Sequence, residues 1–303
     1  MTQTTFFQQL QSQYKKSRKD LINELSGLLG VNADGVYRRI RNETPLTLDE
    51  AFKISEEFNL NFSLLRNTNG EQKESPFLET VRKYFLHYKQ RGKYTLHFDA
   101  KELPVFYLLH KPELYWFKQS FWGQIFFDQK PNLEELKKVH PTELIEEVLE
   151  LYETTDSIDL WEGSIITTTL RQIDYACEIG MITKDKSLSL LDDLSSLLML
   201  LEDYCINGKK MAGGKLEVYL NNVLIGDNTS IVTSDNNITC FLSKNIVDVY
   251  PITDNDFNEK RLKIFNNTIQ RSTRISVSSE RERKKYFKGL HQEVKVQMES
   301  LGK

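Results

Sequence analysis

The sequence is poor in the features that mark a cross-linked, metal-binding or membrane-embedded protein. It contains only three cysteines, which are far apart and form no Cys-x-x-Cys pair, so the pattern predicts neither a disulfide framework nor a zinc site. No run of about 18 apolar residues is present, and we therefore expect no membrane-spanning helix. The first residues lack the apolar segment of an export signal, which predicts a cytoplasmic protein.

Proline and glycine are also scarce, with 7 and 14 residues among 303, and no low-complexity tract interrupts the chain. Hydrophobic residues make up 39% and charged residues 27%, which is typical of a folded protein. A chain of this length usually holds about two domains. The net charge of −3 provides no overall attraction to nucleic acid, so any such binding requires a local basic surface.

The first 65 residues contain three helix starts with clear caps. Ser17 begins the first of these helices, and Gly30 ends it. Asn32 caps the second, and Thr47 with Glu50 forms the reciprocal capping box of the third. Three short helices within about forty residues predict a compact helical unit.

The segment Ile22–Arg41 resembles the helix-turn-helix of the lambda-repressor-like (xenobiotic-response-element) superfamily. The resemblance lies in three packing positions: a small residue in the first helix (Ser26), a glycine in the turn (Gly30) and a branched apolar residue in the second helix (Val36). A small side chain lets two helices approach, and glycine tolerates the positive φ of the turn. The segment 47–65 is similar to the helices that close this domain, so the resemblance covers about a fifth of the chain.

The resemblance implies a bacterial transcription factor whose second helix enters the major groove of double-stranded DNA. The residues that would read bases are Asn32, Ala33, Gly35, Tyr37 and Arg38. Those that would hold phosphates are Lys15, Lys16, Arg18, Lys19, Arg39 and Arg41. Arg38 is the first candidate for a guanine, because a guanidinium can bond O6 and N7 together.

Local charge agrees with this interpretation, since residues 1–45 hold seven basic and four acidic residues. One position departs from the superfamily pattern: Arg39 stands where an apolar residue is usual, and Ile40 follows it, which suggests a rotated or longer second helix. The alternative is that Arg38, Arg39 and Arg41 form only the solvated face of an unrelated helical bundle.

The remaining sequence predicts a larger second domain. We assign 1–66 to the helix-turn-helix domain, the polar stretch 67–75 to a linker, and 76–303 to a dimerisation and sensory domain, which divides into a helical part (76–207) and an α+β part (208–303). Strands are expected near 94–99 and, as a small antiparallel sheet, at 216–223, 230–233, 238–242 and 246–249. Residues 161–201 look like two helices. The fold class is mainly α with a smaller antiparallel β portion (α+β).

Two apolar features of this second domain have alternative explanations. Fourteen aromatic residues lie between positions 84 and 127, and they either line an effector pocket or, more commonly, fill the core and a dimer interface. The helix at 188–201 carries leucines on more than one face, so it is either buried within the monomer or part of a subunit interface.

No catalytic motif stands out, and we predict that the protein is not an enzyme and needs neither cofactor nor metal. The turn Gly208–Lys215 superficially suggests a phosphate loop, but its glycine spacing is one residue too long and a leucine follows its last lysine. The expected partners are double-stranded DNA, a second copy of the chain, and a small-molecule or protein effector, with no membrane. The alternative function is a protein-interaction or scaffold protein whose N-terminal bundle binds protein.

Overall fold

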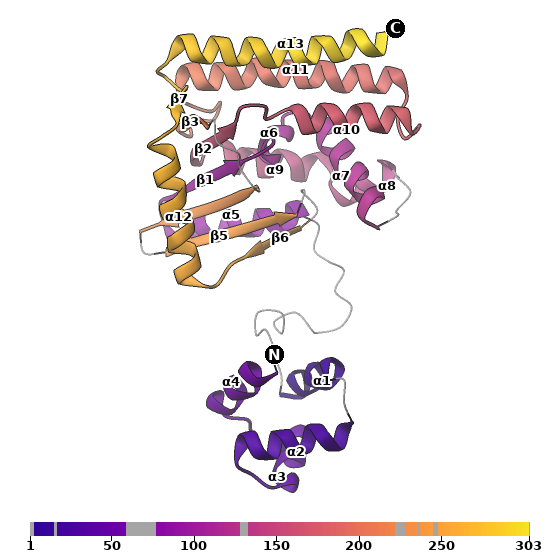
Figure 1. The fold of residues 1–303 in the computed structure, drawn as a ribbon, viewed down its shortest axis with the longest axis vertical. Helices are drawn as coiled ribbons and strands as arrows, with labels where there is room; N and C mark the ends of the chain where they lie inside the picture. The colour runs from indigo at the N-terminus through magenta and orange to yellow at the C-terminus, as the bar shows by residue number, and fades with distance from the viewer. Residues whose placement is uncertain are drawn as a thin grey trace. The chain divides into compact units, whose positions relative to one another are not determined.

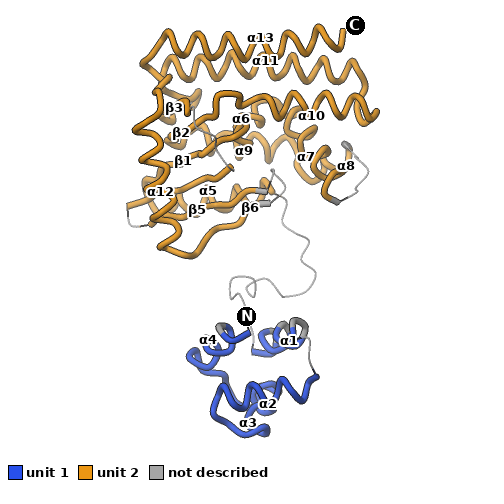
Figure 2. Tube along the Cα trace, viewed as in Figure 1, with its two compact units in different colours: residues 1–75 blue, residues 76–303 orange. Residues whose placement is uncertain are grey.

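The computed structural model describes residues 3–14, 17–58, 77–127, 133–221, 228–235, 237–244 and 248–302. The chain divides into two compact units, residues 1–75 and 76–303 (Figure 2), and each is described by itself. The predicted linker at 67–75 lies outside the described residues, as do Lys15 and Lys16.

Unit 1 is helical. Its elements are α1 (Gln3–Gln13), α2 (Arg18–Leu29), α3 (Ala33–Ile40) and α4 (Leu48–Glu57). The predicted caps are present: Ser17 accepts a hydrogen bond at the start of α2, Asn32 does so at the start of α3, and Gly30 ends α2 in the left-handed conformation. Thr47 and Glu50 exchange the two bonds of a capping box at α4. The apolar faces meet in one small core, formed by Phe6, Phe7, Leu10, Leu21, Ile22, Leu25, Val36 and Ile54.

Unit 2 is built on a seven-stranded mixed sheet with the order β6-β5-β4-β1-β2-β3-β7 (Figure 1). The strands are β1 (Tyr94–Ala100), β2 (Asp156–Glu162), β3 (Leu216–Asn221), β4 (Thr229–Ser234), β5 (Asn237–Lys244), β6 (Asp248–Pro251) and β7 (Thr273–Arg274). The three central strands β1, β2 and β3 are parallel, so helices must connect them. β4, β5, β6 and β7 pair antiparallel at the two sides.

Helices cover both faces of this sheet. They are α5 (Phe77–Arg91), α6 (Val105–Leu108), α7 (Pro112–Phe127), α8 (Leu133–Val139), α9 (Thr142–Glu153), α10 (Thr167–Glu178), α11 (Lys184–Asn207), α12 (Asn255–Ile269) and α13 (Glu280–Gly302). α12 lies on one face, where Phe265 joins a cluster with Leu160, Ile231 and Cys240. The larger core lies on the opposite face, and Figure 1 shows α11 and α13 side by side along its edge.

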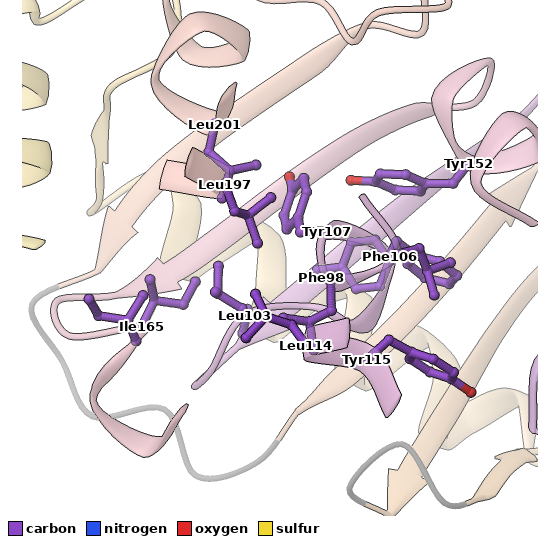
Figure 3. Close-up of a cluster of buried hydrophobic side chains, with 14 of the residues drawn as sticks. Phe98, Leu103, Phe106, Tyr107, Leu114, Tyr115, Tyr152, Ile165, Leu197 and Leu201 are labelled. Carbon is purple, nitrogen blue, oxygen red and sulfur yellow. The ribbon is translucent and has the colours of Figure 1, made fainter. Parts of the chain in front are cut away.

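The aromatic residues between 84 and 127 mostly fill this larger core. Phe106 stacks on Tyr152 with ring centroids 4.9 Å apart, and Phe98 packs beside Phe106 (Figure 3). Two cavities between α5 and the sheet measure about 50 and 80 Å³, far below the size of usual ligand pockets. Six leucines of α11 are fully buried within unit 2 and the other two are partly buried, so burial accounts for this helix.

The α+β fold class is confirmed, but three details of the prediction were wrong. The sheet is mixed rather than a small antiparallel one, because β1, β2 and β3 run parallel. Residues 161–162 end strand β2, whereas a helix was expected. The division at 207/208 is absent, since strands from both sides of it share one sheet. Among the described residues, no helix is both long and apolar enough to span a bilayer.

Candidate nucleic-acid interface

The turn between α2 and α3 fixes the two helices against each other. Gly30 has a φ of 63°, and its N–H bonds to the carbonyl of Ser26, as does the N–H of Val31 at 3.2 Å. The hydroxyl of Ser26 donates to the carbonyl of Ile22 at 2.7 Å, so this small polar side chain stays on its own helix. Val36 is completely buried against α1 and α2 residues. The three packing positions thus occupy a short, internally bonded turn.

The outer face of α3 carries most of the predicted base-reading residues. Asn32, Ala33, Tyr37 and Arg38 are exposed, and Gly35 is half-buried. The Oδ1 atom of Asn32 accepts the N–H of Gly35 at 2.8 Å, so its carbonyl is used for capping and its amide nitrogen remains as a donor. This face therefore offers a guanidinium, a phenol and an amide donor to a groove.

The exposed cations around α3 are weakly held. Arg38 and Arg41 each have a side chain 57% exposed, and both lie near Glu43, at 3.9 Å and 2.9 Å respectively. Ion pairs in water contribute about 0–1 kcal/mol, so these arginines can exchange Glu43 for a phosphate or a base at little cost. Arg18 and Lys19 are exposed in the first turn of α2.

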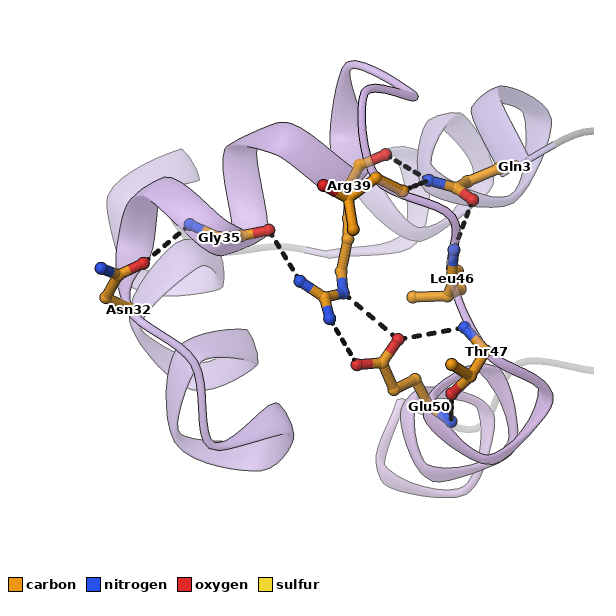
Figure 4. Close-up of polar contacts among 8 residues, drawn as sticks. Gln3, Asn32, Gly35, Arg39, Leu46, Thr47 and Glu50 are labelled. Atoms are coloured by element: carbon orange, nitrogen blue, oxygen red, sulfur yellow. Dashed lines mark hydrogen bonds and ion pairs between the residues drawn. The ribbon is translucent and has the colours of Figure 1, made fainter.

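Arg39 has a different role from the one predicted. Its guanidinium bonds both carboxylate oxygens of Glu50, at 2.7 and 3.2 Å, and the carbonyl of Gly35 at 3.1 Å (Figure 4). The two side chains are only 14% and 17% exposed. The hydrogen bond from Arg39 lowers the pKa of Glu50, against the opposing effect of partial burial. Three N–H donors of Arg39 are therefore engaged within unit 1.

The Arg39–Glu50 pair also joins α3 to α4, and α3 ends at Ile40. Gln3 adds a second tie from α1. Its Nε2 donates to the carbonyls of Arg39 and Thr44 at 2.6 and 2.7 Å, and its Oε1 accepts from the N–H of Leu46.

Sequence reasoning missed Glu50 and Gln3 as residues that position α3. Thr47 with Glu50 does mark a capping box, but nothing in that local pattern shows that the same carboxylate also receives Arg39 eleven residues away. Gln3 lies more than thirty residues from each backbone group that it bonds, so its role depends on the packing of α1 against α3.

Unit 2 contains a buried cluster of polar residues of the kind that also occurs in enzyme active sites. Asp159 on β2 is fully buried, and its Oδ2 accepts the hydroxyl of Tyr107 at 2.7 Å and the indole N–H of Trp161 at 3.1 Å. Burial raises the pKa of Asp159 to about 6, although these two donors oppose the shift.

Lys210 interacts electrostatically with Asp159, and its side chain caps the C-terminal end of α9. Its Nζ donates to the carbonyls of Tyr152 and Thr155 at 3.0 and 2.7 Å, and burial lowers the pKa of Lys210 to about 8. Glu153 bonds His110 at 3.1 Å. Burial raises the pKa of Glu153, but the His110 bond and nearby positive charge outweigh it and lower the net pKa.

The pKa shifts of this cluster accompany its burial in the interior of unit 2. The bonds of Lys210 and Glu153 go to other residues of the chain, and the two cavities beside the sheet are lined by other side chains. The turn Gly208–Lys215 thus anchors Lys210 beneath α9, as a glycine-rich turn before a strand.

Across the described parts of the chain, no group of three or more potential metal ligands comes together. No family model, no curated protein and no solved structure matches the chain.

Proposed function

We propose that the protein is a sequence-specific transcriptional regulator that binds DNA through unit 1 and acts as a dimer through unit 2. The observation that carries the proposal is the arrangement of α3. One side of this helix is held by the buried Val36 and the Arg39–Glu50 pair, while Tyr37 and Arg38 face solvent on the other. A recognition helix needs one fixed side and one exposed side, because its exposed side chains read the DNA bases only when the helix backbone is held in place.

The dimensions of α3 suit the major groove. An α-helix with its side chains is about 10–12 Å across, and the groove is about 12 Å wide. In this proposal Arg38 bonds a guanine, Asn32, Ala33, Gly35 and Tyr37 contact neighbouring bases, and Arg18, Lys19 and Arg41 hold phosphates. Arg39 is withdrawn from the phosphate set and positions α3 instead.

A second candidate function is protein binding by unit 1, and one observation favours it. Leu48 and Phe52, one turn apart on α4, have 77% and 57% of their surfaces exposed. Large apolar side chains exposed next to each other are typical of a protein-interaction site. Under this alternative, unit 1 binds a protein partner through α4 and shows no salt-dependent affinity for DNA.

Selection from genomic DNA fragments by the intact protein, at several salt concentrations, separates the two functions. We expect bound fragments to share a sequence, and affinity to fall steeply with salt because phosphate contacts release counterions. Arg38→Ala should cost about 1–3 kcal/mol and relax selection at one base position. Arg18→Ala should weaken all fragments alike and reduce the salt slope by about one.

Lys295→Ala is the matched control, since it removes the same charge from an exposed position on α13 in unit 2. It should leave both affinity and selection unchanged. If the folded wild-type protein binds no DNA selectively, or if Arg38→Ala and Lys295→Ala behave alike, the DNA-reading role of α3 is wrong.

A further inference from the structure

An apolar patch lies on the surface of unit 2 where α7 and α10 run next to each other. Ile125 of α7, Tyr175 of α10 and Ile179, the C-cap residue of α10, each expose 46% of their surface. Phe121 of α7 contacts Tyr175, with ring centroids 6.3 Å apart, so the two helices form one continuous face. Neighbouring exposed apolar residues of this size on a folded protein usually mark an interaction site.

The same face contains a groove of about 320 Å³. It is lined by Phe121, Trp122 and Ile125 of α7 and by Thr168, Arg171, Gln172 and Tyr175 of α10. The four α10 positions have the spacing i, i+3, i+4 and i+7. This spacing is the diamond of side chains that surrounds a hole in knobs-into-holes packing, so the groove fits a side chain from another helix.

The outward residues of α10 are complementary to themselves. Arg171 and Glu178 lie on opposite sides of Tyr175 along the helix, and Ile179 is at its end. Within the part of the chain that the structure describes, neither Arg171 nor Glu178 belongs to an ion pair. A two-fold interface requires a surface that matches a second copy of itself, and opposite charges around an apolar centre meet this requirement.

We propose that this α7–α10 face binds a second copy of the chain, with the two α10 helices crossing antiparallel about Tyr175. In that register position 171 of one copy faces position 179 of the other. Ile179 of the partner subunit then enters the groove, and Glu178 of the partner subunit reaches Arg171. Each contact occurs twice because the interface is symmetric.

The face is already rigid in a single copy. Below the groove, the buried ammonium of Lys118 on α7 bonds Gln172 at 2.6 Å and Thr169 at 3.3 Å on α10, and Glu102 at 2.8 Å. These bonds fix α7 against α10 before any association. Since little ordering is required on binding, the apolar contact is available for affinity.

This inference rests on the proposed function for its biological purpose, because a helix-turn-helix protein commonly reads two half-sites as a dimer. It is nevertheless measured without DNA, so its failure leaves the DNA-reading role of α3 untouched. Conversely, a protein that dimerises through α10 but binds no DNA would refute only the proposed function.

The test is sedimentation of the intact protein over a range of concentrations. The wild type should be a dimer, and Arg171→Glu and Glu178→Arg should each weaken dimerisation about tenfold or more, because two attractive pairs become two repulsive ones. The double variant Arg171→Glu/Glu178→Arg should recover most of this loss, since the pairs are restored with reversed sign. Ile179→Asp should give monomers.

Met199→Glu on α11 is the control, because Met199 is a large apolar residue, 55% exposed, outside this face. It should leave the dimer intact. Circular dichroism shows whether each variant is folded. A monomeric wild type, a dimer that the single reversals do not weaken, or a double variant as weak as the single ones would overturn the proposal.

Discussion

The Arg39–Glu50 pair offers the sharpest test of how unit 1 holds its exposed helix. The perturbation is a double-mutant cycle of Arg39→Ala, Glu50→Ala and both together. Glu50 also caps α4 through Thr47, and that loss, about 1 kcal/mol, occurs in both Glu50 variants and cancels in the cycle. The coupling energy therefore reports the pair alone.

The expected magnitude follows from burial and geometry. Exposed pairs contribute about 0.2–1 kcal/mol, whereas breaking a fully buried pair costs about 3–5 kcal/mol. Side chains 14% and 17% exposed, joined by two charge-assisted hydrogen bonds, lie between these limits. We expect a coupling of about 2 kcal/mol, or about thirtyfold in the opening equilibrium of α3.

Hydrogen–deuterium exchange of peptides from α3 and α4, in the intact protein, measures that equilibrium. All three tryptophans are in unit 2, at positions 116, 122 and 161, so their fluorescence shows independently that unit 2 is unchanged. Because the pKa of Glu50 is lowered, its contribution is present above the unfolded value of about 4.3 and is lost as pH falls through the folded pKa. A coupling below about 0.5 kcal/mol at pH 7 would refute this account of α3.

Two further predictions concern unit 2. Gly214→Ala should lower the free energy of unfolding of unit 2 by about 3 kcal/mol in a urea titration followed by tryptophan fluorescence. The reason is that a Cβ at position 214 would lie 2.5 and 2.6 Å from the backbone oxygens of Glu153 and Thr155, which cannot move aside. Gly289→Ala, in open space on α13, should raise the free energy of unfolding by up to about 1 kcal/mol in the same titration. Equal effects would contradict the close approach. Burial lowers the pKa of His97 to about 4 in the folded protein. In the unfolded chain the same side chain takes up a proton below about pH 6.5. The free energy of unfolding should therefore fall by up to about 3 kcal/mol between pH 6.5 and 4, relative to His97→Gln. Parallel pH profiles would show that His97 is solvated.

The local elements of the site could be predicted because their causes are local. Ser17, Asn32 and Thr47 accept bonds from amides three residues away, and Gly30 ends α2 by its own backbone conformation. Such interactions depend only on nearby residue types. The role of Arg39 could not be found in this way, since its partner Glu50 is on the next helix and the ion pair exists only when α3 and α4 pack together.

The same distinction explains the error at β2. The segment Asp156–Glu162 has three acidic residues among seven, a composition unfavourable for strands. It is a central strand because it pairs with β1 on one side and β3 on the other, and because Tyr107 and Trp161 donate hydrogen bonds to Oδ2 of the buried Asp159. None of these partners is visible from the segment itself.

By itself, the sequence determined where α2, α3 and α4 begin and end, which side of α3 is apolar, and that the protein combines helices with a sheet. These features follow from residue type and spacing along the chain. The tertiary structure alone decided that the sheet is mixed, that Arg39 positions a helix instead of contacting solvent, and that Ile125, Tyr175 and Ile179 share one exposed face. Strand partners, ion-pair partners and surface patches join residues far apart in sequence, and only the packed chain brings them together.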